Sequence, residues 1–145
     1  GAAAWQGVRP GARVAYVGQK PWIQAATFRQ NVVGLSTSGG GGGGGDGGVD
    51  DPRYAETLRA CCLTKDLRSF PAGDASEIGE RGVNLSGGQK ARCALARAAY
   101  SDADVYLLDD PLAAVDPEVA HKIFRRCLAR HGGLLRRRGG TRARA

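Results

Sequence analysis

Residues 85–89 read Leu-Ser-Gly-Gly-Gln, and the run from Lys90 to Tyr100 that comes next is rich in alanine, arginine and leucine. Two glycines behind a serine, followed by strong helix formers, predict a turn that opens directly onto a helix. The first N–H groups of a helix have no partner inside it, and the helix dipole adds about half a positive charge there. The stretch therefore fits a phosphate site, to which Ser86 would add a hydroxyl donor. Taken alone, it also fits an ordinary helix capped by Ser86.

A second stretch favours the phosphate site. Residues 105–108, Val-Tyr-Leu-Leu, are apolar throughout, which predicts a strand covered on both faces of a parallel sheet. Asp109 and Asp110 follow directly and place two carboxylates at the carboxyl end of that strand. An aspartate pair at a strand end can also serve only as a cap or a turn. Because this pair comes shortly after the glycine turn and its helix, the combination favours phosphate and metal chemistry.

Together these motifs carry a resemblance to a known family. LSGGQ at 85–89, VYLLDD at 105–110 and PLAAVD at 111–116 resemble the nucleotide-binding domain of ATP-binding-cassette (ABC) transporters. The wording resembles the first such domain of the C subfamily, the multidrug-resistance-associated proteins, from about Arg13 to about Arg142. The resemblance implies an α/β chain with a partial P-loop NTPase fold, in which parallel core strands adjoin a helical subdomain that carries the signature motif. It also implies ATP hydrolysis coupled to export across a membrane, with ATP and Mg²⁺ as cofactors.

The resemblance assigns roles to the motif residues. The signature motif binds the nucleotide of a partner domain in trans, through Ser86, Gly87, Gly88 and Gln89. Asp109 is the Walker B aspartate that holds magnesium. Asp110 stands where fully active members carry a glutamate as the base for the attacking water. Since an aspartate is one methylene shorter, its carboxylate reaches less far toward that water, and the composite site resembles those called degenerate.

A strand before these motifs carries a further candidate. Residues 13–17, Arg-Val-Ala-Tyr-Val, predict a strand between two glycines, and Gln19 comes after it. By resemblance, Gln19 is the Q-loop glutamine, which contacts the magnesium ion and the attacking water and passes movement to the membrane domains. Its position agrees, because loops outside the carboxyl ends of strands are where open α/β sheets bind ligands.

Turn and cap signals divide the chain into six segments. Asp51 before Pro52 and Asp116 before Pro117 each predict a helix start. Nine of the ten residues from Gly39 to Gly48 are glycine, which predicts a flexible insert rather than a dinucleotide-binding loop. The predicted segments are an irregular start (1–12), the Q-loop strand with its adjoining segment (13–35), the disordered poly-Gly insert (36–48), the helical subdomain with the signature motif (49–100), the Walker B strand, D-loop and next helix (101–133), and a basic tail (134–145).

Composition narrows the possible partners. The net charge is +7, but nine Lys or Arg and no acidic residue lie from Val119 onward, so the rest of the chain is close to neutral. We therefore expect no nucleic-acid partner: the arginine-rich tail lacks interleaved aromatic residues that would stack on bases. The four cysteines have no C-x-x-C spacing and predict free thiols of a reducing compartment. His121 lies off the apolar face of its predicted helix and is expected at the surface, and His131 is expected near that helix's end.

Two family motifs are missing from the chain. It contains no G-x-x-x-x-G-K-[ST], and no switch histidine follows a strand after Thr141. We therefore expect the middle and carboxyl part of a nucleotide-binding domain, inactive when isolated. The implied partners are a second nucleotide-binding domain in a sandwich dimer and the transmembrane domains, which place the chain at the cytoplasmic face of a membrane. The alternative is a non-catalytic remnant or interaction module without ATPase activity.

Overall fold

The computed structural model of the chain describes residues 11–34, 51–129 and 132–135. The poly-Gly insert, His131 and the arginines of the tail lie outside these residues. In chain order the elements are β1 (Val14–Val17), β2 (Ala26–Thr27), α1 (Phe28–Val33), α2 (Pro52–Ala60), α3 (Thr64–Ser69), a 3₁₀ turn (Gly73–Ala75), β3 (Glu77–Ile78), a 3₁₀ turn (Glu80–Gly82), α4 (Gly87–Tyr100), β4 (Val105–Leu108), α5 (Pro117–Ile123) and a π-helical turn (Phe124–Leu128).

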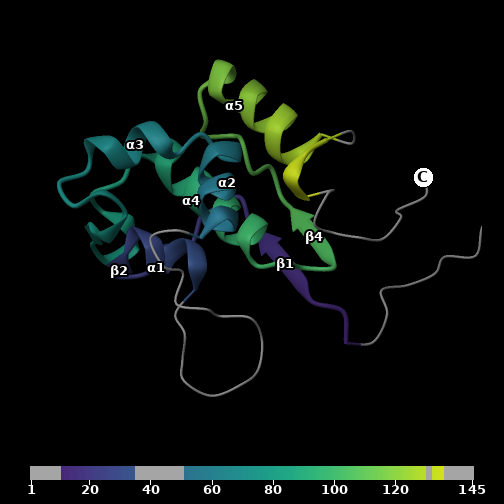
Figure 1. The fold of residues 1–145 in the computed structure, drawn as a ribbon, viewed down its shortest axis with the longest axis horizontal. Coiled ribbons are helices and arrows are strands. Elements are labelled where there is room, and N and C mark those ends of the chain that lie inside the picture. The colour runs from purple at the N-terminus through teal and green to yellow at the C-terminus, as the bar shows by residue number, and fades with distance from the viewer. Residues whose placement is uncertain (1–10, 35–50, 130–131, 136–145) are drawn as a thin grey trace, which may run out of the picture.

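Helix α4 is the element around which the others pack. Figure 1 shows it between the group α1–α3 and the strands β1 and β4. Small residues of α4 allow close packing: Ala94 and Ala98 meet Ala15 and Val17 of β1 in a small core. Leu95 of the same helix lies in the larger core. The helix is therefore buried around most of its circumference.

The larger core joins the helices that surround α4. Its fully buried side chains include Phe28 of α1, Leu63 between α2 and α3, and Ile123 of α5. Leu134 and Leu135, with which the predicted tail begins, are also buried in this core. The first two residues of the predicted tail therefore add apolar side chains to the core.

Strands β1 and β4 pair in parallel, with Val14 opposite Val105 and Val17 opposite Leu108. This confirms the predicted parallel core strands and the predicted bounds of β4. The prediction that β4 is covered on both faces is wrong for the described residues, because Leu107 is 53% exposed and its register partner in β1, Tyr16, is 66% exposed. Side chains alternate across a strand, and α4 covers only the face that carries Ala15 and Val17.

The predicted helix starts are confirmed. The Asp51 carboxylate accepts from the Arg53 N–H and caps α2, and the Asp116 carboxylate accepts from the Glu118 N–H and caps α5. The α5 residue His121 is exposed, as the sequence predicted.

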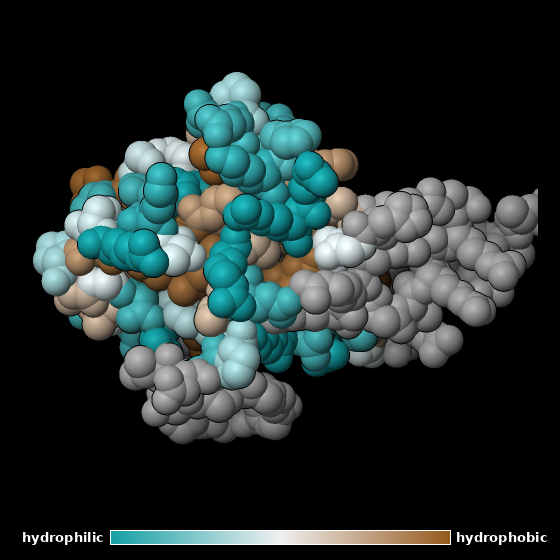
Figure 2. Space-filling model, turned by 45° about the horizontal axis from the view of Figure 1, so that its top comes forward, coloured by the Kyte–Doolittle hydropathy of each residue, from teal (hydrophilic) through white to brown (hydrophobic). Residues whose placement is uncertain are grey.

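Hydrophilic residues dominate the upper part of the face drawn in Figure 2. Within the described residues, no helix combines the length and the apolar character that crossing a bilayer requires.

Candidate functional site

The glycine turn of the signature motif is a capped helix start. The Ser86 hydroxyl oxygen accepts a hydrogen bond from the Gln89 N–H at 3.2 Å, and the Gln89 side-chain carbonyl accepts from the Ser86 N–H at 2.9 Å. This reciprocal capping box satisfies two backbone donors of the turn. A hydroxyl has one donor and two acceptor positions, so the cap leaves the Ser86 O–H able to donate outward. Ser86 and Gly87 are exposed.

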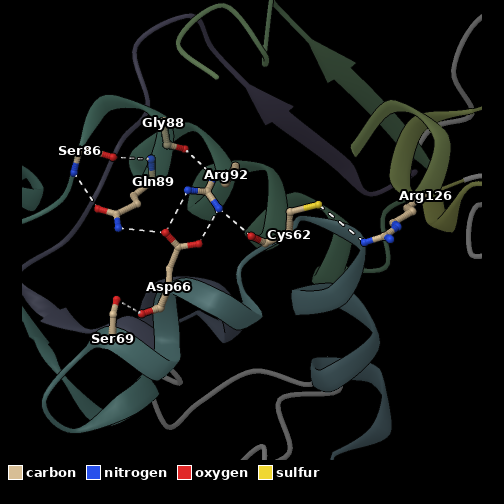
Figure 3. Close-up of polar contacts among 8 residues, drawn as sticks. All are labelled: Cys62, Asp66, Ser69, Ser86, Gly88, Gln89, Arg92 and Arg126. Atoms are coloured by element: carbon tan, nitrogen blue, oxygen red, sulfur yellow. Dashed lines mark hydrogen bonds and ion pairs between the residues drawn. The ribbon is translucent and has the colours of Figure 1, made fainter. Parts of the chain in front are cut away.

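The side chain of Gln89 faces inward. Its amide nitrogen donates to the Asp66 carboxylate at 3.0 Å, while its carbonyl oxygen bonds the Ser86 backbone (Figure 3). Both ends of the amide are therefore engaged within the chain. Of the four residues predicted to bind nucleotide, Gln89 thus turns its side chain toward α3.

Sequence reasoning missed two residues that hold this turn. The Arg92 guanidinium donates to Asp66 at 2.6 and 3.1 Å, to the Cys62 carbonyl at 2.6 Å and to the Gly88 carbonyl at 3.2 Å. Burial raises the pKa of Asp66, but the hydrogen bonds from Arg92 and Gln89 outweigh it and hold that pKa below its ordinary value. Arg92 stands three residues behind Gln89, one helical turn along, and Asp66 lies in a separate helix, so no local pattern links them.

Gly88 lies against the segment that follows the aspartate pair. A Cβ at Gly88 would lie 3.1 Å from the Ala114 carbonyl oxygen, whereas a Cβ at Gly87 would meet only the Ala114 methyl at 3.8 Å. The second glycine therefore allows a closer backbone approach than the first. Through this contact, the segment that follows Asp110 packs against the start of α4.

The other predicted site residues follow the carboxyl ends of β1 and β4, which we call the sheet edge. Because Val17 and Leu108 are register partners, Gln19 and Asp109 follow adjacent strand ends, and the Asp109 N–H donates to the Val17 carbonyl at 2.8 Å. Asp110 has a φ of +45°, a left-handed conformation that aspartate tolerates better than most residues. Gln19, Asp109 and Asp110 are all exposed.

The side-chain oxygen atoms of Gln19, Asp109 and Asp110 are suitable ligands for magnesium. No group of three or more His, Cys, Asp or Glu that could hold a metal lies within residues 11–34, 51–129 and 132–135. Mg²⁺ is usually held by one or two carboxylates and completes its shell with water and phosphate oxygens. The Asp109 carboxylate and the Gln19 amide oxygen fit such a shell, which leaves the remaining positions to water and a nucleotide.

Arg97 ties the segment after Gln19 to helix α4. Its guanidinium donates to the Trp22 carbonyl at 2.9 Å and to the Asn31 backbone carbonyl at 2.6 Å, and it lies 5.0 Å from the centroid of the Trp22 ring. Burial lowers the pKa of Arg97. The same helix thus holds the signature turn at its start and the post-Gln19 segment near its end.

Comparisons with known proteins identify the family. A family model described as "ABC transporter" matches residues 4–113. The chain is 52% identical over 124 residues to "Multidrug resistance protein mrp-7" of Caenorhabditis elegans, which covers 86% of the chain and 7% of that protein. It is 49% identical over 121 residues to human "ATP-binding cassette sub-family C member 3", which covers 83% of the chain and 7% of that protein. The chain thus spans less than a tenth of the length of these relatives. It belongs to the ABC transporter family, which implies the P-loop NTPase fold, and its relatives confirm the resemblance to the C subfamily.

Proposed function

We propose that the chain supplies the signature motif and the magnesium carboxylate of an ATPase that drives export across a membrane. The observation that carries this proposal is the link between the two motifs. Gln19 and Asp109 follow paired strand ends, and the segment after Asp110 packs on Gly88 at the start of α4. The segment that leaves the aspartate pair therefore fixes the position of the signature motif relative to that pair.

The two motifs serve different nucleotides in this proposal. Asp109 and Gln19 hold the magnesium ion of an ATP bound by a P-loop of the same domain, and Asp110 acts on the attacking water. Ser86, Gly87 and Gly88 instead close on the γ-phosphate of an ATP held by a second nucleotide-binding domain. The exposed turn and the unpaired amides at a helix start supply donors for that phosphate.

The proposal includes partners and a location. The second nucleotide-binding domain faces the signature turn in a sandwich dimer, and transmembrane domains receive the movement that closure produces. Such an assembly places the chain at the cytoplasmic face of a membrane. The isolated chain neither binds ATP tightly nor hydrolyses it, because ATP retention in this family needs a P-loop.

The test replaces the matched segment of full-length mrp-7 with residues 11–135 of this chain. The Walker B aspartate of the second nucleotide-binding domain is also replaced by asparagine, so that ATP hydrolysis by the purified chimera reports the nucleotide bound in the chain's own domain. We expect Asp109→Asn to lower the rate about a hundredfold. The substitution removes the carboxylate that holds the metal ion, and a bound metal ion stabilises the charge of the transition state by several kcal/mol. Asp104→Asn is the matched control: Asp104 is an exposed aspartate at the opposite end of the same strand, paired with Arg13. It should change the rate by less than about twofold.

The alternative is a non-catalytic remnant that only associates with a partner. It predicts a folded chimera with no ATPase above the Asp109→Asn background. Equal losses in the Asp109 and Asp104 variants would also contradict our proposal, because charge loss at either end of the strand would then suffice.

A further inference from the structure

We propose that Asp66 is a positioning residue for the signature turn. From α3 it holds Gln89 and Arg92, and through them it sets the orientation in which the first turn of α4 meets the partner's nucleotide. This inference deepens the proposed function and rests on it, since it concerns how the signature turn acts in trans.

Both oxygens of the Asp66 carboxylate accept hydrogen bonds from the start of α4. One oxygen accepts from Gln89 at 3.0 Å and from Arg92 at 3.1 Å, and the other accepts from Arg92 at 2.6 Å. The Asp66 and Arg92 side chains are only 15% and 13% exposed. A forked guanidinium on a carboxylate fixes both distance and angle, which a single hydrogen bond does not.

Two routes lead from Asp66 into the signature turn, and Figure 3 shows both. Through Gln89, the carboxylate reaches the Ser86 backbone N–H at 2.9 Å. Through Arg92, it reaches the Gly88 carbonyl at 3.2 Å. Because the two routes end on either side of Gly87, a displacement of Asp66 changes the tilt of the whole turn.

The core anchors helix α3 mainly at its two ends, through the buried Leu63 before it and the partly buried Phe70 after it. Within Thr64–Ser69 there is no buried residue and no side-chain cap, although Leu67 packs partly against the core. Buried ion pairs often add little to stability compared with apolar packing, but they specify one arrangement of the groups that they join. The Asp66 contacts therefore link the placement of α3 to the orientation of the signature turn.

The rival explanation is that the Asp66–Arg92 pair only stabilises the fold. The chain offers a matched control that separates the two explanations. Arg29 and Asp74 form a similar pair, with nitrogen to oxygen distances of 2.8 and 2.9 Å and side chains 22% and 26% exposed. This pair joins α1 to the turn Gly73–Ala75 and not to α4. Losing either pair should destabilise the fold, but only the Asp66 pair should alter action on nucleotide.

The functional test is a mixing assay. The full 145-residue chain is added to the second nucleotide-binding domain of a C-subfamily relative, and ATP hydrolysis is measured against ATP concentration. We expect Asp66→Ala to raise the ATP concentration for half-maximal stimulation about tenfold, because small misplacements of positioning groups are costly. Asp74→Ala should leave this concentration unchanged. Asp66→Glu, which keeps the carboxylate, should recover part of the loss. Equal shifts in the Asp66→Ala and Asp74→Ala chains would overturn the inference.

Amide hydrogen exchange supplies a readout that needs no partner. In the chain alone, Asp66→Ala should speed exchange at the Gln89 N–H, which the Ser86 hydroxyl holds, and Asp74→Ala should not. The isosteric Asp66→Asn is measured in the same way in case the alanine variant does not fold. If the wild-type chain gives no stimulation in the mixing assay, the proposed function fails, and exchange alone then decides the inference. Unchanged exchange at Gln89 in the Asp66 variants would overturn it.

Discussion

The signature turn and the sheet edge are held in opposite ways. At the turn, the side chains of Gln89 and Arg92 are anchored on Asp66, and the Ser86 hydroxyl caps the helix. At the edge, the exposed carboxylates of Asp109 and Asp110 make no side-chain hydrogen bond or ion pair with any described residue, and only their backbone is fixed. The turn presents backbone donors supported by anchored side chains, whereas the edge presents carboxylates that no described residue holds.

This difference matches the two tasks that we propose. A surface that closes on a nucleotide carried by another domain must keep its shape before that nucleotide arrives, because ordering it on contact would weaken binding. Carboxylates that serve a metal in their own domain gain their order from the ion and its phosphates. The two parts should therefore respond to different substitutions in different assays.

The largest effect should separate the two parts. Asp109→Asn should lower ATP hydrolysis by the mrp-7 chimera about a hundredfold, since there the carboxylate serves the metal of its own domain. In the mixing assay the same substitution should have little effect, because the nucleotide belongs to the partner. Comparable losses in the two assays would mean that the two parts serve one nucleotide.

A gain of activity should result at the sheet edge from Asp110→Glu. The added methylene carries the carboxylate toward the water that the shorter side chain does not reach, and we expect chimera turnover to rise about tenfold. The left-handed φ of Asp110 should cost this variant about 1 kcal/mol of stability, which thermal unfolding would reveal. A lowered turnover in a stably folded variant would exclude Asp110 as the base.

A smaller effect should distinguish the two glycines of the turn. Gly88→Ala should lower stimulation in the mixing assay about fivefold, because its methyl crowds the Ala114 carbonyl at 3.1 Å and tilts the turn. Gly87→Ala, whose methyl makes an ordinary 3.8 Å contact, is the matched control and should lose less. A greater loss in Gly87→Ala would show that the approach of the nucleotide, and not packing on Ala114, requires the glycines.

The smallest effect concerns acid. The pKa of Asp66 in the folded chain lies below its ordinary value of 3.8, so the unfolded chain binds more protons as the pH falls through this range. The stabilisation by Asp66 is therefore complete above about pH 4 and is lost as the pH falls through the folded pKa. Urea unfolding between about pH 3 and 6 should show a shallower acid slope in Asp66→Asn than in the wild-type chain. Identical slopes would mean that the Arg92 contacts do not stabilise the ionised carboxylate.

Local patterns in the sequence predicted the elements that position the site. The caps Asp51 and Asp116 and the apolar run at 105–108 each carry their information within a few residues, and the structure agrees with all three. Parallel pairing was also expected from the family resemblance, and it brings Gln19 and Asp109 to one edge of the sheet.

Long-range partners were not predictable in this way. Nothing in the sequence around Arg92 or around Asp66 marks these two residues as partners. The exposure of Leu107 was not predicted for a related reason. An apolar run indicates that a strand can be buried, but it does not indicate which other elements cover the strand. Such facts depend on tertiary packing, which a single sequence does not display.

We propose that the signature turn of this chain acts on a nucleotide held by another domain. The most direct test is the mixing assay with the wild-type chain, in which ATP hydrolysis by the second nucleotide-binding domain is measured as the chain is added. We expect a saturable rise that approaches one chain per partner domain, is reduced by Gly88→Ala and survives Asp109→Asn. No rise, or a rise that Asp109→Asn abolishes and Gly88→Ala leaves intact, would contradict it.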